Sequence, residues 1–287
     1  WIGIQTTRHA AVSSFLEAAR LILDWGRFLY PGEDRATTPT RFRDMVRETI
    51  RFRANKSIGT IKGLLDGGVM ENPNLKKKIL FDRTCKAVVI HGAHQAAIEE
   101  IEIPEVKPGD TLIRVAYEAV CATDIEIYEG TLGYYQNGIA KYPIVPGHEF
   151  SGRVVSVGSN VNHLEVGDLV VVECIQSCGS CEMCQRENAI ACRQRTELGV
   201  MGRNGGYAEY VVVPGRYVHR LQPDFELMRA CLCEPLAVAL KGLKRLRRTW
   251  RDRKMQRQVA VVGAGSLGHL CARVLEHWGH RVTVFDQ

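Results

Sequence analysis

Four cysteines lie close together in the segment CGSCEMCQRENAIAC, at positions 178, 181, 184 and 192. Neighbouring thiolates repel one another unless a divalent cation neutralises them, and four sulfur ligands complete the tetrahedral shell of a zinc ion. A closed shell leaves no position for a substrate, so we expect Cys178, Cys181, Cys184 and Cys192 to form a structural zinc site. Unliganded surface thiols and a nucleic-acid-binding zinc ribbon are the alternatives. The regular spacing disfavours the first, and the absence of two distant Cys-x2-Cys pairs disfavours the second.

Three other segments carry residue types that bind a catalytic metal: Cys121 in VCATDIEIYEG, His148 and Glu149 in PGHEF, and Glu234 in CLCEPLAVAL. Each has an ordinary structural alternative: a buried cysteine, a turn histidine beside a solvated glutamate, or a glutamate that caps a helix. Together they form a set of one thiolate, one imidazole and carboxylates that can hold zinc and leave a position for water or a substrate oxygen. The sequence therefore predicts an open, catalytic zinc site.

A glycine-rich turn near the end of the sequence predicts a nucleotide site. Gly263, Gly265 and Gly268 form the pattern G-x-G-x-x-G directly after the apolar run VAVV, and Asp286 follows the next predicted strand. Such glycines let the backbone approach a pyrophosphate, and a helix N-terminus favours its negative charge. An acid placed like Asp286 accepts hydrogen bonds from both ribose hydroxyls and repels a 2′-phosphate. The pattern therefore predicts a dinucleotide site that favours NAD over NADP.

Three successive regions of the chain differ in their hydrophobic period. Residues 1–82 show helical patterns, including a capping box from Ser14 to Glu17, and no catalytic constellation. From about Lys86, short runs such as KAVVI, TLIRVAYEAV, SGRVVSVG and DLVVVE predict an all-β domain. The run CEPLAVALKGLKRL then predicts a helix, and a strand, glycine turn, helix and strand follow. We expect a helical extension of unknown role at 1–82, a catalytic domain at 83–236 and a partial nucleotide-binding domain at 237–287.

The composition excludes several classes of protein. The 287 residues are 45% hydrophobic and 24% charged with no long apolar run, which predicts a soluble globular protein without a membrane segment. No secretory signal follows Trp1, and the cysteines are clustered rather than spread, so we expect a reducing, cytoplasmic location. The basic stretch 241–257 contains one aromatic residue, Trp250, and is interpreted as a solvated helix and connector rather than a nucleic-acid surface.

Seven motifs follow one another along residues 86–287: CATD, GHEFSGRVVSVGSNV, VGDLVVV, the four-cysteine segment, GGYAEYVVVP, CEPLAVAL and VVGAGSLG. In this order they resemble the motifs of the zinc-dependent medium-chain dehydrogenase/reductase family. The resemblance implies a GroES-like β domain with catalytic and structural zinc sites, followed by the first part of a Rossmann doubly wound domain. It also implies NAD(P)-dependent oxidation of a small alcohol or reduction of a carbonyl compound, in a homo-oligomer.

Residue by residue, the resemblance makes Cys121, His148 and Glu149 catalytic zinc ligands. Glu234 matches the additional carboxylate of the polyol, threonine and sugar dehydrogenase branches, where simple alcohol dehydrogenases have a third ligand cysteine. The neighbouring Cys233 keeps the possibility of a third cysteine ligand open. Whether Glu234 binds zinc directly is also left open.

Two further positions concern the proton that leaves the alcohol. Thr123 matches the hydroxyl residue that passes this proton outward. Glu126 stands where many members have a histidine of the proton relay, as in some sugar dehydrogenases, and this favours a sugar or polyol substrate; a solvated surface glutamate is the alternative. The segment 130–145 is expected to border the substrate cleft, with Tyr134, Tyr135 and Gln136 as candidates for binding hydroxyls or as ordinary exposed residues.

Three other functions are consistent with the sequence. The chain could be a non-catalytic member that binds zinc and nucleotide, a zinc-dependent nucleic-acid binder, or part of a bifunctional protein in which residues 1–82 end another domain. The nucleotide-binding pattern stops after its second strand, so we expect the 287 residues alone to lack full turnover.

Overall fold

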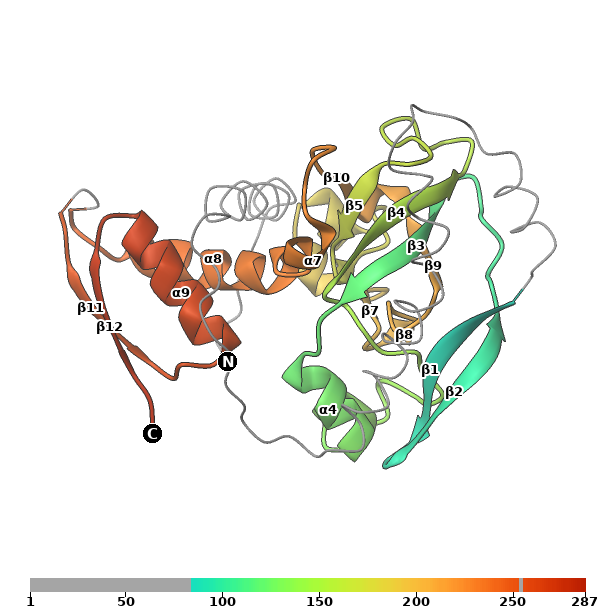
Figure 1. Ribbon diagram of the computed structural model, residues 1–287, viewed down its shortest axis with the longest axis horizontal. Helices are drawn as coiled ribbons and strands as arrows, with labels where there is room; N and C mark the ends of the chain where they lie inside the picture. Colours follow the sequence, from blue (N-terminus) through green and yellow to red (C-terminus); the bar gives the residue numbers. More distant parts are fainter. Residues whose placement is uncertain (1–83, 253–254) are drawn as a thin grey trace.

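The computed structural model describes residues 84–252 and 255–287. The predicted helical extension at 1–82 lies outside these residues. A body of β-sheets carries the middle of the sequence, and one long helix, α8, leads from it to a small α/β unit at the C-terminal end (Figure 1).

The largest sheet has the strand order β10-β5-β4-β3-β9, and all its neighbouring strands are antiparallel. Its strands are β3 (Asp110–Glu118), β4 (Phe150–Val157), β5 (Leu169–Val172), β9 (Tyr210–Pro214) and β10 (Val218–Arg220). Valine and isoleucine fit the pleated surface, and alternate residues such as Ile113, Val115, Val154 and Val170 form one buried cluster. The strands predicted from TLIRVAYEAV, SGRVVSVG and DLVVVE are thereby confirmed.

Two smaller sheets flank the main sheet. β1 (Thr84–Gly92) and β2 (Gln95–Glu102) form a hairpin, which reaches the rest of the body through bridges from Ala87 to Ala208 and from Ile90 to Ile144. The other sheet joins β6 (Ile175–Gln176), β7 (Thr196–Leu198) and β8 (Gly202–Arg203). Because β6 pairs with β7, the four-cysteine segment is a loop whose two ends are held together by the sheet.

Short helices connect the strands: α4 (Ala122–Glu129), α5 (Gly133–Gln136), α6 (Glu182–Gln185), η1 (Ala189–Ala191), η2 (Gly215–Tyr217) and α7 (Leu227–Ala230). The predicted long helix is confirmed as α8 (Cys233–Arg248), with Cys233, Leu236, Leu240 and Leu243 on one buried face. Proline is favoured at the first position of a helix, but Pro235 lies at the third position of α8. The N–H groups of the first turn have no partner within a helix, so the missing N–H of Pro235 costs α8 no hydrogen bond. The predicted domain boundary at residue 236 falls inside α8, so this division stays a prediction.

The C-terminal unit contains β11 (Gln258–Val262), α9 (Ser266–His277) and β12 (Arg281–Phe285), with the two strands parallel. Leu270, Val274 and Leu275 of α9 share a core cluster with Leu236 and Leu240 of α8. The predicted succession of strand, glycine turn, helix and strand is confirmed. In the part of the chain that the structure describes, no helix combines the length and the apolar character needed to cross a membrane.

Two glycine substitutions should change stability in opposite directions. A Cβ on Gly152 of β4 would lie 2.4 Å from the Arg114 carbonyl oxygen of β3, so Gly152→Ala should destabilise the protein by about 1–3 kcal/mol. Gly242 in α8 has no atom within 4 Å of such a Cβ, so Gly242→Ala should stabilise it by about 0.5–1 kcal/mol. Urea unfolding measures both changes, and equal stability of the two variants would contradict the close strand packing.

Candidate active site

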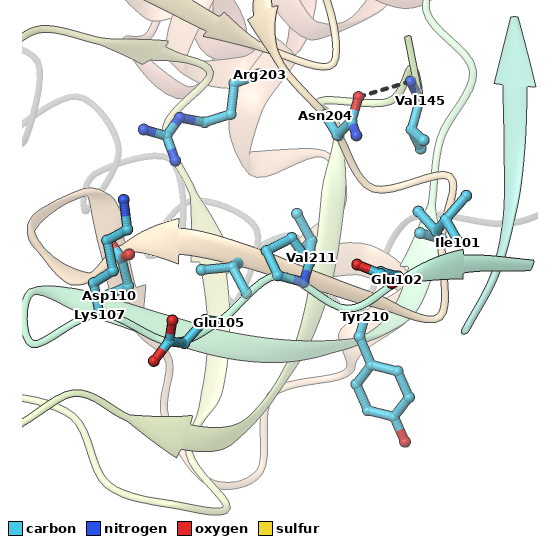
Figure 2. Close-up of a pocket in the computed structure, with 14 residues that line it drawn as sticks. Ile101, Glu102, Glu105, Lys107, Asp110, Val145, Arg203, Asn204, Tyr210 and Val211 are labelled. Atoms are coloured by element: carbon cyan, nitrogen blue, oxygen red, sulfur yellow. Dashed lines mark hydrogen bonds between the residues drawn. The ribbon is translucent and has the colours of Figure 1, made fainter. Parts of the chain in front are cut away.

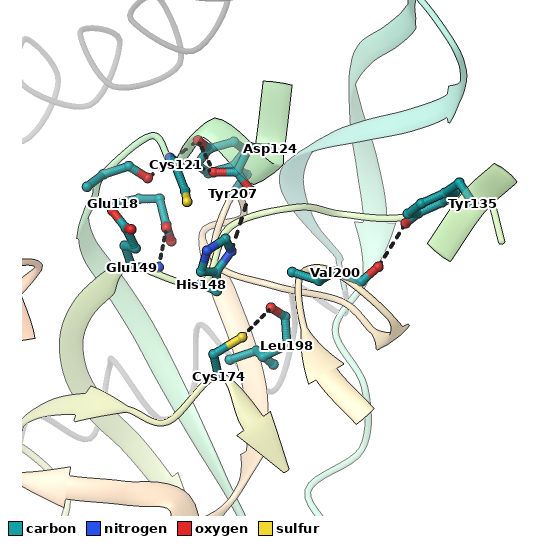
Figure 3. Close-up of polar contacts among 11 residues, drawn as sticks. Glu118, Cys121, Asp124, Tyr135, His148, Glu149, Cys174, Leu198, Val200 and Tyr207 are labelled. Atoms are coloured by element: carbon teal, nitrogen blue, oxygen red, sulfur yellow. Dashed lines mark hydrogen bonds and ion pairs between the residues drawn. The ribbon is translucent and has the colours of Figure 1, made fainter. Parts of the chain in front are cut away.

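Cys121, His148 and Glu149 come together at one end of the main sheet (Figure 3). Cys121 is the N-cap residue of α4, just after β3, while His148 and Glu149 directly precede β4. One ligand atom from each of the three lies within 4.8 Å of the others, and His148 and Glu149 are buried. A thiolate, an imidazole and a carboxylate at this separation have the ligand chemistry of a zinc site.

Asp124 supports these side chains from the first turn of α4. It is fully buried, and its Oδ2 accepts hydrogen bonds from the Cys121 backbone N–H at 2.9 Å and the Tyr207 hydroxyl at 3.1 Å. Its other oxygen, Oδ1, lies 3.6 Å from His148 Nδ1, which is too long for a hydrogen bond. Asp124 therefore fixes the backbone of one candidate ligand and faces the ring of another.

Burial sets the electrostatics of the site. It raises the pKa of Glu118, whose Oε1 accepts a hydrogen bond from the Glu149 backbone N–H at 2.9 Å, and it raises the pKa values of Asp124 and Glu149. For His148, burial alone would lower the pKa, but its hydrogen bond with Cys121 and the charges of Asp124 and Glu234 raise it to about 10. The cluster stabilises positive charge at its centre.

Three polar atoms at this site lack a hydrogen bond with any described residue: Glu118 Oε2, Asp124 Oδ1 and His148 Nδ1. Buried polar atoms are normally satisfied, and unpaired ones indicate a missing ligand, ion or water. Together with the donor set, the orphaned atoms fit a bound divalent cation.

Glu234 lies near this cluster without joining the compact set of ligand atoms formed by Cys121, His148 and Glu149. It is the second residue of α8, and its charge acts on His148. Burial raises its pKa to about 7. Its neighbour Cys233 is fully buried in the apolar cluster with Leu236 and Leu240, and burial raises its thiol pKa. Of the two residues, Glu234 is the one whose charge acts on His148, while Cys233 packs in the apolar core.

The two predicted proton-relay residues lie on α4. Thr123 is partly buried in the first turn, next to Asp124 and two residues after Cys121. Glu126 is exposed three residues further on. Residues three apart share a face of a helix, so the two side chains lie on the same side of α4.

The four predicted cysteine ligands also come together, on the loop between β6 and β7. Their Sγ atoms all lie within 4.8 Å of one another, with separations of 3.8 Å for Cys178 and Cys184, 3.5 Å for Cys181 and Cys184, and 3.8 Å for Cys181 and Cys192. Zinc–sulfur bonds of about 2.3 Å in a tetrahedron require sulfur separations of roughly 3.8 Å. All ten cysteines of the chain are free, so the loop holds no disulfide.

Backbone groups prepare this loop for a metal. The N–H groups of Ser180 and Cys181 hydrogen-bond to the Cys178 sulfur and lower its pKa to about 6. Arg216 closes the base of the loop by donating to the carbonyl oxygens of Ser177 at 2.7 Å and Cys178 at 3.1 Å. The lowered pKa of Cys178 and the fixed loop base fit a structural metal site, although at Cys181 a backbone hydrogen bond is outweighed by the neighbouring sulfurs, which raise its pKa to about 11.

The predicted glycine turn lies between β11 and α9. Gly263 has φ +98°, which favours glycine, and a Cβ on Gly268 would lie 1.8 Å from the Gly263 carbonyl oxygen. Gly265 is the N-cap of α9, and a Cβ added there would have no atom within 4 Å, so the backbone is open to a ligand. Asp286 follows β12, and its Oδ2 accepts a hydrogen bond from the Ala264 N–H at 3.3 Å. The structure thus brings the turn and the acid together.

A separate cavity of about 240 Å³ lies beside the end of β2, and charged residues such as Glu105, Lys107 and Arg203 surround it (Figure 2). None of the predicted metal, proton-relay or cofactor residues lines it, but Val145 belongs to the segment expected to border the substrate cleft. Asn204 at its edge accepts a hydrogen bond from the Val145 backbone N–H at 3.1 Å, three residues before His148. The cavity therefore adjoins the loop that contains His148, but the candidate metal ligands and proton-relay residues do not line it.

Sequence reasoning missed Asp124, Glu118 and Tyr207. Asp124 stands three residues after Cys121, the spacing of a capping box, and this signal could have identified it as a partner of the loop. Tyr207 is 83 residues from Asp124, and no local pattern indicates their contact.

Residues 107–223 match the family described as the alcohol dehydrogenase GroES-like domain. The chain is 33% identical over 187 residues to a sorbitol dehydrogenase of Bombyx mori, a match that covers 65% of this chain and 51% of the relative. It is 35% identical over 192 residues to an erythritol/L-threitol dehydrogenase of Mycolicibacterium smegmatis, covering 64% and 52%. The chain thus spans about half the length of the curated relatives it matches.

Among solved structures, a protein from Sinorhizobium meliloti described as a zinc-binding dehydrogenase, with NADP bound, superposes with a TM-score of 0.62 at 30% identity. The superposition covers 71% of this chain and 56% of the other. It confirms the predicted fold class, a GroES-like β domain followed by a Rossmann-type unit. The matched domain, the relatives and this shared fold support the assignment of the chain to the zinc-dependent medium-chain dehydrogenase/reductase family.

Proposed function

We propose that the protein is an oxidoreductase that uses zinc to transfer hydride between an alcohol and NAD(P), and that the alcohol is a polyol, a sugar or a related secondary alcohol. The main observation behind this proposal is that ligand atoms of Cys121, His148 and Glu149 all lie within 4.8 Å of one another. The chain also has a glycine-rich turn at the start of α9 of the kind that binds dinucleotides. The sorbitol and erythritol/L-threitol dehydrogenases among its relatives support the substrate class. We also infer a small-molecule substrate, a cytoplasmic location and a homo-oligomer.

Cys121, His148 and Glu149 would hold the catalytic zinc, with Glu234 as the nearby additional carboxylate. When bound, zinc supplies a Lewis acid that polarises an alcohol or carbonyl oxygen. Asp124 faces the His148 ring with Oδ1 at 3.6 Å from Nδ1, and its charge favours a cation at this site.

The remaining residues move the proton and bind the cofactor. Thr123 accepts the hydrogen bond of the substrate hydroxyl and passes its proton outward, and the exposed Glu126 on the same face of α4 takes it toward solvent. The turn of Gly263, Gly265 and Gly268 receives the pyrophosphate at the N-terminus of α9. Asp286 binds the ribose hydroxyls and favours NAD over NADP, although the Sinorhizobium meliloti relative was solved with NADP.

Replacing one ligand of the catalytic set should abolish activity and spare the rest of the protein. We expect Cys121→Ser to reduce the zinc content from two ions per chain to one. In the full-length enzyme, we also expect it to lower the rate of polyol oxidation on the order of 10³-fold or more, because an essential electrostatic group is lost. Metal analysis, steady-state kinetics and NAD titration measure these effects. Cys271→Ser, at a partly exposed cysteine of α9 outside both metal sets, is the matched control. Full activity of Cys121→Ser would refute the role of Cys121.

The four-cysteine loop should act on stability. Cys178→Ser leaves three sulfur ligands and a loop of unpaired thiols, so we expect the loss of one zinc ion and about 2–5 kcal/mol of stability, comparable to the loss of a native disulfide. Chemical unfolding with parallel metal analysis measures both. A variant with unchanged stability and two zinc ions per chain would show that the loop is no structural metal site.

The choice between the two nicotinamide cofactors should depend on the charge of Asp286. We expect Asp286→Ser to reduce the preference for NAD over NADP by about 10- to 100-fold, because the carboxylate no longer binds the ribose or repels the 2′-phosphate. Titration of both cofactors into the two proteins measures the ratio of dissociation constants. An unchanged ratio would show that another residue selects the cofactor.

A further inference from the structure

Three polar side chains from separate segments meet beside the four-cysteine loop: Tyr134 of α5, Arg195 just before β7, and Glu197 within β7. Arg195 Nη2 lies 3.0 Å from Glu197 Oε1 and donates a hydrogen bond to Tyr134 Oη at 3.2 Å. The Tyr134 hydroxyl lies 3.4 Å from the same Oε1. Both contacts with the Glu197 carboxylate fall on Oε1, and no contact with Oε2 is found among the described residues.

This cluster is mostly buried. The Glu197 side chain is 13% exposed and the Arg195 side chain 21% exposed. Removing such charges from water costs free energy that an ion pair only partly repays. Glu197 Oε2 is not one of the fully buried side-chain atoms without a partner, so water, or a ligand hydroxyl in its place, can reach it. Glu197 therefore holds an acceptor that a hydroxyl group can satisfy.

The protein holds these groups in place before any ligand arrives. Arg195 Nη1 donates to the Ile190 carbonyl oxygen at 2.9 Å, within the four-cysteine loop. The Glu197 backbone N–H donates to the Met201 carbonyl oxygen at 2.9 Å, and its own carbonyl oxygen accepts from Val200 and Met201. A site fixed in this way loses little entropy when it binds.

Glu197 also lies close to the candidate active site. Gly199, two residues further along, packs against Gly147, the residue before His148: a Cβ on Gly199 would lie 2.3 Å from the Gly147 carbonyl oxygen. Two residues span about 7 Å of extended chain. Glu197 is therefore within the length of a short polyol from the cluster that contains His148.

Cys174 gives a second link between the two places. Its Sγ donates to the carbonyl oxygen of Leu198, the neighbour of Glu197, at 3.8 Å, and Figure 3 places both residues beneath His148. Burial raises the pKa of this thiol, and the charges of Glu234 and Glu197 raise it further. Cys174 is thus within electrostatic reach of both carboxylates.

We propose that Glu197, together with Tyr134 and Arg195, binds a hydroxyl group of the substrate remote from the reacting carbon, and so selects polyols and sugars over simple alcohols. The substrate O–H donates to Glu197 Oε2. Its oxygen accepts from the Tyr134 hydroxyl, whose present contact with Glu197 is long at 3.4 Å. A site built to bind a hydroxyl rejects an analogue that lacks it, because its buried polar groups then stay unpaired. This assignment rests on the proposed function and narrows its substrate class.

The test compares xylitol and sorbitol with 2-propanol, using the full-length, zinc-loaded protein and NAD. We expect Glu197→Gln to lower kcat/KM for the polyols by about 10- to 100-fold, mainly through KM, and to leave 2-propanol within about twofold of wild type. Tyr134→Phe keeps the ion pair of Arg195 and Glu197 and should give a smaller loss with the same selectivity. Glu182→Gln is the matched control, because it breaks an exposed 2.7 Å ion pair with Arg186 in the same loop.

The outcomes separate this assignment from the proposed function. Equal losses on polyols and 2-propanol, or no loss on either, would overturn it, and so would a wild-type protein that oxidises 2-propanol but no polyol. A wild-type protein that oxidises none of the three contradicts the proposed function instead. Saturation-transfer NMR with xylitol then decides the role of Glu197: binding lost in Glu197→Gln supports it, and equal binding or none in both proteins overturns it.

Discussion

Buried negative charge around a single histidine is the constraint on which the candidate active site depends. Glu118, Asp124 and Glu149 are held where burial raises the pKa of each carboxyl, and Cys121 adds a thiol to the same place. Isolated buried carboxylates cost several kcal/mol unless a cation compensates them. Burial acts to lower the pKa of His148, and the hydrogen bond with Cys121 together with the charges of Asp124 and Glu234 raises it instead. A divalent cation satisfies the same demand with its charge at the centre of the donor set.

Close backbone contacts hold this charge cluster together. A Cβ on Gly199 or on Gly205 would overlap the Gly147 carbonyl oxygen, so the loops that contain these glycines pack directly on the residue before His148. Gly147 itself has φ +100°, which favours glycine. Because Gly199 follows β7, the four-cysteine loop is anchored to the strand that contacts the active-site loop. A structural metal in that loop would therefore steady β7 and, through it, the polar cluster of Tyr134, Arg195 and Glu197.

The parts of this molecule that the sequence predicts are those set by local patterns. The strands from β-branched runs, α8 from its apolar spacing, and the turn from Gly263 to Gly268 all depend on residues close in the chain, and the structure confirms these elements. The four cysteine ligands are close in sequence, so their meeting also follows from spacing. Cys121, His148 and Glu149 come from two distant segments, and only their place in an ordered series of motifs indicates that they meet.

The parts that sequence patterns do not reveal depend on packing between distant segments. Tyr207 reaches Asp124 across 83 residues, and Glu197 meets Tyr134 across 63, with no local signal for either contact. The distance of Glu234 from the metal ligands depends on how α8 docks against the sheet. Its position near the compact set, but outside it, is likewise a result of tertiary structure.

Anomalous diffraction at the zinc edge, from crystals of the zinc-loaded protein, tests most directly whether the buried negative charge is built to hold a catalytic metal. We expect two zinc peaks in each chain. One should lie among the sulfurs of Cys178, Cys181, Cys184 and Cys192, and the other should contact Cys121 and His148 with a carboxylate oxygen nearby. A single peak at the four sulfurs, with His148 paired to Asp124 and no metal beside Cys121, would contradict the catalytic metal site.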